Sequence, residues 1–213
     1  MRLYLSSFRI GNNPNKLVEL TGKGGQAVFI VNALDYKPES RGKFLVSEIQ
    51  ILRELGYDVE ELDLRMWFGK KAEDLEKYLR TKNLVWVNGG NTFLLRRAMK
   101  QSGFDEIITR LLKEDVIVYA GFSAGCAVLH KDLHGIDITD DPNISVEGYT
   151  GEIEWAGLGI IDFNIVTHYE SEHNESEEAK KEMDFYIHNK VPFKTLSDGE
   201  VLIVNNDFIE IIK

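Results

Sequence analysis

Hydrophobic positions along the chain fall into short apolar or alternating runs separated by runs with helical spacing. The first kind predicts strands at 3–6, 26–32, 57–64, 84–88, 116–120, 159–168 and 195–196, and a hairpin of 201–205 and 208–212. The second kind predicts helices at 41–55, 71–80, 93–101, 104–113, 124–129 and 174–189. Asn174 and Glu177 have the spacing of a capping box for the last helix.

Strands that alternate with helices favour a mostly parallel sheet with helices on both faces, an α/β three-layer sandwich. The chain has 213 residues, of which 43% are hydrophobic, and this suits one domain spanning residues 1–213. The segment 132–155 is the least regular, and we expect a loop or small hairpin over the functional site. Parallel sheets place such sites at the carboxyl ends of their strands.

Charge and cysteine content narrow the class of partner. The net charge of −10 argues against nucleic acid and against an anionic membrane surface, since both need a basic face. The longest uncharged run, 116–129, is too short to span a bilayer, and no basic segment followed by an apolar stretch marks a signal peptide. The single cysteine, Cys126, excludes an internal disulfide. We expect a soluble cytoplasmic protein, and a homodimer stays open because α/β domains often pair through edges or helix faces.

The stretch Gly121-Phe122-Ser123-Ala124-Gly125 has the pattern of a nucleophile elbow, a tight strand-to-helix turn around a serine. An apolar run leads into it, and a run of small residues leads out. Such a turn lifts the serine hydroxyl above the sheet edge, where the free N–H groups of the new helix also point. We therefore expect Ser123 to be a nucleophile.

A serine nucleophile needs a base that removes its proton, and the chain has five histidines. His168 ends an apolar strand pattern, so we expect it at the same sheet edge as Ser123. His130 lies seven residues after Ser123 on the same predicted helix, roughly 10 Å away at ~1.5 Å per residue, which is too far. His188 is late on a helix, while His134 and His173 lie in predicted loops and stay open. The pattern favours His168.

A carboxylate completes such a group by orienting the imidazole and stabilising its charged form. Asp198 lies between two strand patterns in an Asp-Gly pair, which is also the commonest hairpin signal. From the residues alone, the ordinary turn is the more frequent interpretation of that pair. Three other aspartates stay open for the orienting role: Asp137, Asp140 and Asp141.

Gly89 and Gly90 follow the predicted strand 84–88 and leave their backbone N–H groups unshielded. Together with the N–H of Ala124, they are candidates for an oxyanion hole, where one lost donor typically costs ~3–4 kcal/mol of barrier. The alternative is an ordinary strand-to-helix turn with Asn91 or Thr92 as the N-cap.

Three further features favour structural interpretations. The glycine-rich stretch 22–25 precedes a strand, whereas a phosphate loop follows one, so we expect a turn. The acidic stretch 170–178 surrounds His173, and we favour a solvated helix start over a metal site. Cys126 should be a small buried apolar residue on another helix face from Ser123. We predict no metal ion and no organic cofactor.

The elbow, the turn at 88–93 and the order of elements together resemble the aspartyl dipeptidase (peptidase E) family of serine peptidases. That family has the class I glutamine amidotransferase-like fold, with serine in place of cysteine at the elbow. The resemblance extends from the strand at 26–32 to that at 201–205. Residues 157–159 with 167–169, and residues 196–199, are similar to the family segments that carry the catalytic histidine and the acidic residue.

The resemblance implies a role for each matching residue. Ser123 would be the nucleophile, His168 the general base and Asp198 the orienting acid. Gly90 and Ala124 would be the oxyanion donors. An aspartate after the elbow has also been considered for the acid in this family, and Asp140 is the nearest candidate here.

The implied activity is the hydrolysis of small peptides, Asp-Xaa dipeptides in particular, through an acyl-enzyme and without a cofactor. Two departures from the family pattern bear on the substrate: Thr167 stands where proline often precedes the histidine, and the acidic stretch 170–178 follows it. If that stretch faces the site, it would repel an aspartate side chain but could hold a free amino group. A hydrolase of another amide or ester, and a non-catalytic binding or regulatory protein, therefore remain alternative hypotheses.

Overall fold

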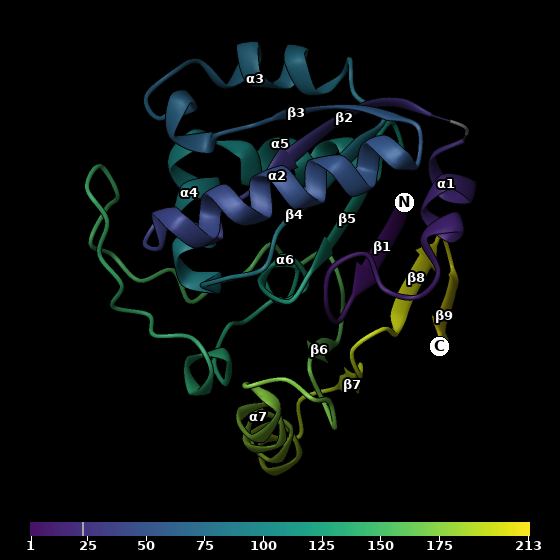
Figure 1. The fold of residues 1–213 in the computed structure, drawn as a ribbon. Helices are drawn as coiled ribbons and strands as arrows, with labels where there is room; N and C mark the ends of the chain where they lie inside the picture. The colour runs from purple at the N-terminus through teal and green to yellow at the C-terminus, as the bar shows by residue number, and fades with distance from the viewer. Residues whose placement is uncertain (23) are drawn as a thin grey trace.

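The computed structural model describes residues 1–22 and 24–213, which form a seven-stranded sheet with helices on both faces (Figure 1). Lys23, in the stretch where we expected a turn, lies outside the described residues. The strand order is β3-β2-β4-β5-β1-β8-β9. The strands are β1 (Arg2–Ser6), β2 (Gly25–Ile30), β3 (Tyr57–Glu61), β4 (Leu84–Val87), β5 (Val118–Phe122), β8 (Val201–Asn205) and β9 (Phe208–Ile212).

The five strands from β3 to β1 in the sheet order are parallel, and the hairpin of β8 and β9 continues the sheet antiparallel to β1. The predicted α/β fold with a mostly parallel sheet is therefore confirmed. The central strands β4 and β5 are buried along their whole length, because helices cover both of their faces. This explains why they read as continuous apolar runs in the sequence.

Helices pack on the two faces of this sheet around two separate hydrophobic clusters. One face carries α3 (Ala72–Leu79), α4 (Thr92–Ser102), α5 (Phe104–Lys113) and the short α6 (Ala124–Ala127). The other face carries α1 (Pro14–Thr21) and α2 (Pro38–Glu54). Alternate residues of β2 divide between them, with Val28 in the first cluster and Phe29 in the second. Three short 3-10 helices are η1 (Asn32–Leu34), η2 (Leu64–Trp67) and η3 (Ile136–Ile138).

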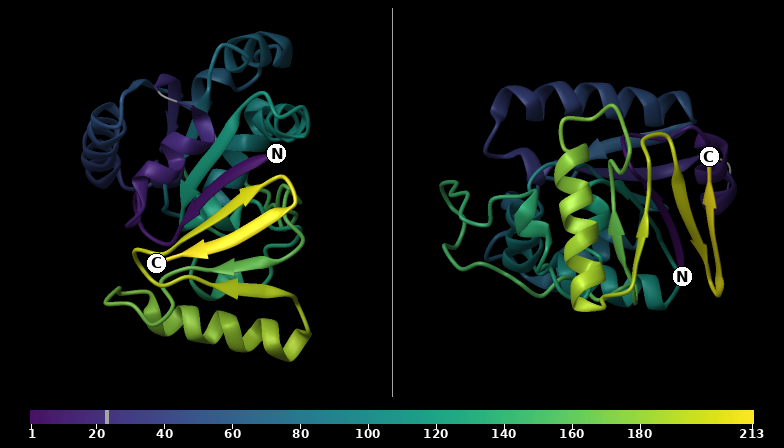
Figure 2. Two further views of the ribbon diagram at one scale, coloured as in Figure 1. Left: turned by 90° about the vertical axis from the view of Figure 1, so that its right-hand side faces the viewer. Right: turned by 90° about the horizontal axis from the view of Figure 1, so that it is seen from below.

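A second sheet of two parallel strands, β6 (Asn164–Val166) and β7 (Phe193–Thr195), lies below the large one in Figure 1. The helix α7 (Ser176–Asn189) packs against this small sheet (Figure 2). The predicted strand 159–168 is therefore wrong in length and in its sheet. The reason is local: the N–H groups of residues 158–160 donate to carbonyls 128–130 at the end of the elbow turn, so they form a loop.

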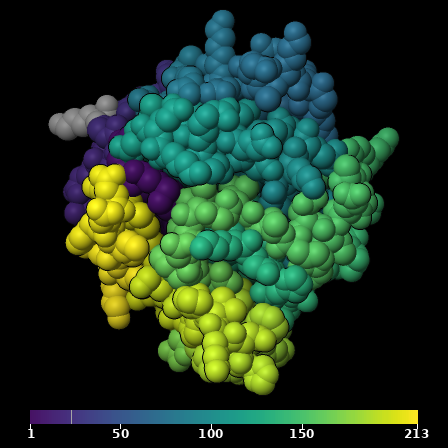
Figure 3. All heavy atoms as spheres, turned by 180° about the vertical axis from the view of Figure 1, so that it is seen from behind, coloured from purple at the N-terminus to yellow at the C-terminus, as the bar shows by residue number. Residues whose placement is uncertain are grey.

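Two other predictions about local structure differ from the structure, and one helix was not predicted at all. The helix α7 begins at Ser176 with Glu175 as N-cap and no side-chain capping bond, so the capping box of Asn174 and Glu177 does not form. The helix after the elbow ends at Ala127. No pattern predicted α1. The irregular segment 132–155 is mostly loop, as expected, and Figure 3 shows it in green between the blue-to-teal helices and the yellow-green region of α7. Within the described residues, no helix is long and apolar enough to cross a membrane.

Candidate active site

The elbow residue Ser123 stands between β5 and α6 with φ 49° and ψ −115°. A non-glycine residue in this region stores about 1–3 kcal/mol of strain, which neighbouring structure must offset. The flanking glycines explain how: a Cβ at Gly121 or Gly125 would lie 2.8 or 2.5 Å from the carbonyl oxygen of Val87 on β4. The elbow can press against the neighbouring strand only because neither residue has a side chain.

A cavity of about 230 Å³ opens at this carboxyl edge of the sheet, and both Ser123 and His168 line it. Phe8, from the loop after β1, forms part of its wall and packs edge-on against the rings of Phe122 and His168. Glu175, at the start of α7, also lines the cavity. One residue of the acidic stretch 170–178 therefore does face the site.

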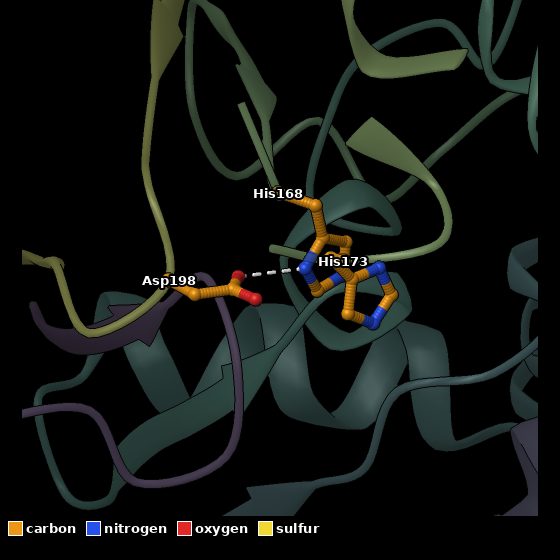
Figure 4. Close-up of side chains that lie close together, drawn as sticks. All are labelled: His168, His173 and Asp198. Carbon is orange, nitrogen blue, oxygen red and sulfur yellow. Dashed lines mark hydrogen bonds and ion pairs between the residues drawn. The ribbon is translucent and has the colours of Figure 1, made fainter. Parts of the chain in front are cut away.

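The imidazole of His168 is held by a carboxylate from another part of the chain. Its Nδ1 lies 2.8 Å from Oδ1 of Asp198, as the dashed line in Figure 4 shows. The hydroxyl of Ser7 donates to the same carboxylate at 2.7 Å and accepts the backbone N–H of His168 at 2.8 Å. A bound carboxylate on Nδ1 selects the tautomer whose Nε2 is free to accept a proton.

His173 stacks face to face on His168, with ring centroids 3.7 Å apart and 9° between the planes (Figure 4). Its Nδ1 accepts the N–H of Glu175 at 3.2 Å, which fixes the ring over its neighbour. Burial, and then the neighbouring His173, lower the pKa of His168 below its ordinary value, against the opposing effect of Asp198. A lowered pKa keeps the imidazole neutral, the form that a general base requires.

Ser123 and His168 line the same cavity, but no hydrogen bond joins their side chains in the described part of the chain. Such bonds are often long in unliganded sites and tighten when substrate is present. Ser123 and His168 therefore share the cavity without a hydrogen bond between their side chains.

The turn after β4 contains two glycines whose backbone lines this cavity. Gly89 and Gly90 both line it, and Gly90 has φ +135°, a conformation that side chains rarely adopt. A Cβ at Gly90 would also lie 2.6 Å from the carbonyl oxygen of Ala33. Among residues 1–22 and 24–213, the N–H groups of Gly89 and Gly90 donate no hydrogen bond. Asn91 caps α4 by accepting the N–H of Leu94, so the turn is also an ordinary helix start.

The other candidate acids make no hydrogen bond or ion pair with His168 in the described part of the chain. Asp140 lines the cavity, but its carboxylate accepts the backbone N–H of Thr92 at 2.7 Å. Asp137 and Asp141 accept N–H groups within their own loop. The structure bonds His168 to Asp198 and places His168 in the cavity that Ser123 lines, whereas none of these three aspartates bonds His168 among the described residues.

The remaining histidines have other surroundings. His130 is buried and accepts the N–H of Ile165 through Nε2, and burial lowers its pKa to about 3. His134 stacks on Trp155, and His188 is exposed on α7. Cys126 is fully buried, as expected, and burial raises the pKa of its thiol.

His168, His173 and Asp198 carry ligand-type atoms within 4.8 Å of one another, the spacing of a metal site. Two features argue against one. Nearly parallel stacked rings direct their nitrogen lone pairs side by side, so they do not converge on one ion. In addition, Nδ1 of His168 is already bonded to the carboxylate.

Sequence patterns missed two residues of this region. Ser7 bonds both His168 and Asp198, but nothing in its neighbourhood marks a contact across more than 160 positions. Glu182 reads as a surface position of an acidic helix, yet it is buried in a recess beside the cavity.

The chain matches a family model along nearly its whole length. The model of peptidase family S51 matches residues 12–212. An uncharacterized peptidase of Listeria monocytogenes is 29% identical over 118 residues, and this match spans about half the length of that relative. An uncharacterized peptidase of Pasteurella multocida is 26% identical over a match that covers 81% of this chain and 74% of that relative's length. A probable alpha-aspartyl dipeptidase of Drosophila melanogaster is 25% identical over a match that covers 81% of this chain and 68% of that relative's length.

Solved structures show the same fold. The structure of a putative peptidase E protein from Listeria monocytogenes superposes with a TM-score of 0.81, covering 100% of this chain and 98% of that one at 22% identity. A peptidase from an acI-B1 actinobacterium superposes with a TM-score of 0.65 at 18% identity.

Proposed function

The chain belongs to peptidase family S51, and we propose that it is a serine peptidase that hydrolyses small peptides through a triad of Ser123, His168 and Asp198. One observation carries the proposal: a buried imidazole, bonded through Nδ1 to a carboxylate, lines the same cavity as a strained elbow serine. Strained backbone at both Ser123 and His168, which has φ 60°, is the kind of outlier that clusters at functional sites.

The roles follow from this geometry. His168 takes the hydroxyl proton of Ser123 through Nε2 as the serine oxygen attacks the scissile carbonyl carbon. The developing oxyanion lies against the N–H groups of Gly90 and Ala124, with Gly89 shaping the turn. His168 then protonates the leaving amine, and water releases the acyl group in the second half of the cycle. Asp198 stabilises the imidazolium that forms in both halves.

The proposed substrates are Asp-Xaa dipeptides, and one cationic side chain of the cavity supports this. Lys37, at the start of α2, lines the cavity, and it is the single lysine or arginine among the described residues that do so. Its ammonium group lies 4.8 Å from the centre of the Tyr36 ring. Lys37 would pair with the substrate's aspartate carboxylate, while Asp140 and Glu175, which also line the cavity, would face the amino end.

A dipeptide panel tests the proposal. Purified wild type, Ser123→Ala and Lys37→Gln are each assayed against Asp-Xaa and Ala-Xaa dipeptides. We expect turnover of Asp-Xaa by wild type, loss of turnover in Ser123→Ala, and a raised KM for Asp-Xaa alone in Lys37→Gln. Full activity of Ser123→Ala would refute the mechanism. Turnover of Ala-Xaa equal to that of Asp-Xaa would refute the substrate assignment and leave the mechanism intact.

A further inference from the structure

A narrow recess extends from the catalytic cavity between α7 and the loop after η3. Ser123 and His168 line both this recess and the cavity, and Glu182 and Thr139 line the recess alone. Its open volume is about 20 Å³, enough for one water-sized group. The recess therefore admits a single small polar group attached close to the reacting carbonyl.

The lining of the recess is acidic, and two of its buried polar side chains have an atom without a hydrogen-bond partner among the described residues. Glu182 is only 5% exposed, and its Oε1 has no hydrogen-bond partner. The hydroxyl of Thr139 is likewise buried without a partner. Asp140 and Glu175 add two more carboxyl groups, and none of the described residues that line the recess is a lysine or arginine. Buried polar atoms without partners are rare in folded proteins, so these need an explanation.

We propose that this recess binds the free α-ammonium group of the peptide substrate, with Glu182 as its main anionic partner. A primary ammonium has three N–H donors and no acceptor, and it is about the size of a water molecule. Glu182 Oε1, the Thr139 hydroxyl and a carboxylate oxygen of Asp140 or Glu175 offer one acceptor to each donor. The proposal rests on the proposed function, because it places this ammonium next to the bond that Ser123 attacks.

The position of the recess identifies which amine it takes. In a peptide, the α-nitrogen is two bonds from the carbonyl carbon of the same residue, roughly 2.5 Å away given standard backbone bond lengths. A lysine ammonium is separated from that carbon by four further side-chain carbons, too many for a water-sized space that Ser123 itself lines. The recess thus selects substrates with a free N-terminus at the first residue and excludes cleavage inside longer chains.

Proton release accompanies this binding. Burial raises the pKa of Glu182 to about 8 and that of Asp140 to about 7, so much of the pair is protonated in the empty recess at pH 7. The ionisable groups that face the pair are Glu175 and Tyr186 on α7, His168 from the loop before it, and Lys37 from α2. An entering ammonium favours the ionised carboxylates, which then lose their protons to solvent.

A binding experiment without catalysis tests the recess. Ser123→Ala protein is titrated calorimetrically with L-aspartyl-L-alanine and with succinyl-L-alanine, which differs from it only by lacking the amine. A second pair, L-alanyl-L-alanine and propionyl-L-alanine, makes the same comparison without the side-chain carboxylate. We expect each amine to bind about 10- to 100-fold more tightly than its partner, the range for a charge-assisted hydrogen bond. Titrations in two buffers of different ionisation enthalpy count the protons released.

Variants assign the effect to the recess. Glu182→Gln and Thr139→Val, each added to Ser123→Ala, should reduce the preference for the amine, and Glu182→Gln should also reduce proton release to the share that Asp140 contributes. Glu177→Gln is the matched control, because it makes the same change at an exposed position of the same helix. The proposal is overturned if the amine and des-amino ligands bind equally well, or if neither binds. It is also overturned if Glu182→Gln keeps the wild-type preference for the amine. Preserved amine preference in a protein that hydrolyses no peptide would refute the proposed function alone.

Discussion

Replacement of Asp198 by asparagine should slow peptide hydrolysis more than replacement by alanine. The ionised carboxylate accepts the Nδ1–H of His168 at 2.8 Å and leaves Nε2 free to accept the proton of Ser123. An asparagine amide can instead donate to Nδ1, which stabilises the opposite tautomer with its proton on Nε2. Alanine removes the orienting group but does not favour that inactive tautomer.

The magnitude follows from the surroundings of the pair. A hydrogen bond to a charged group contributes about 1.5–3 kcal/mol, and each 1.36 kcal/mol of barrier is about tenfold in rate. The Asp198 side chain is 24% exposed, so solvent screens part of this interaction. We expect kcat to fall about 10- to 50-fold in Asp198→Ala. The tautomer preference in Asp198→Asn should add roughly another tenfold.

The assay is steady-state hydrolysis of the best dipeptide from the panel, with kcat and KM determined separately. Asp184→Asn, an exposed change of the same kind on α7, is the control for altered charge. Asp140→Asn should raise KM for free-amine substrates and change kcat by less than about threefold, since its carboxylate bonds Thr92 and not His168. If Asp198→Asn keeps wild-type kcat while Asp140→Asn loses it, the assignment of the orienting acid is wrong.

Three further predictions concern packing and protonation. Gly125→Ala places a methyl group 2.5 Å from the Val87 carbonyl oxygen, so the free energy of unfolding should fall by about 1–3 kcal/mol. Urea denaturation measures this change, and an unchanged midpoint would contradict the close approach. His173→Phe keeps a ring over His168 but removes a group that lowers its pKa, so the acidic limb of the kcat/KM profile should move to higher pH, and a fixed limb would refute this influence. Glu182 holds its proton in the folded state up to about pH 8 but releases it near 4.5 when unfolded, so the free energy of unfolding should fall as pH rises between these values. Denaturation at several pH values should give a flatter profile for Glu182→Gln; equal slopes would exclude this residue as the cause.

Local patterns were sufficient to predict the fold class and the elbow. Continuous apolar runs mark strands buried on both faces, and two glycines around a serine mark a turn pressed against its neighbour. The sequence could not show why both glycines are needed, because Val87 is more than 30 positions away and becomes a neighbour only through the pairing of β4 with β5.

The position of His168 shows where pattern-based prediction reaches its limit. We expected it at the end of a strand in the main sheet, but β6 pairs with β7 in a separate sheet. His168 itself has φ 60°, and its backbone N–H donates to the hydroxyl of Ser7, which fixes the direction in which the side chain enters the cavity. Only the long-range packing of the chain determines such a contact. For the same reason, the burial of Glu182 depends on how α7 docks and cannot be read from an acidic helix.

The central claim is that Ser123 is a nucleophile activated by His168, and covalent labelling tests it without knowledge of the substrate. The protein is incubated with a fluorophosphonate, and the modified residue and its rate of modification are determined by mass spectrometry. The account predicts one rapid adduct on Ser123, lost in Ser123→Ala and slowed by about 100-fold or more in His168→Gln. An unmodified Ser123, or labelling at the same rate in His168→Gln, would contradict it.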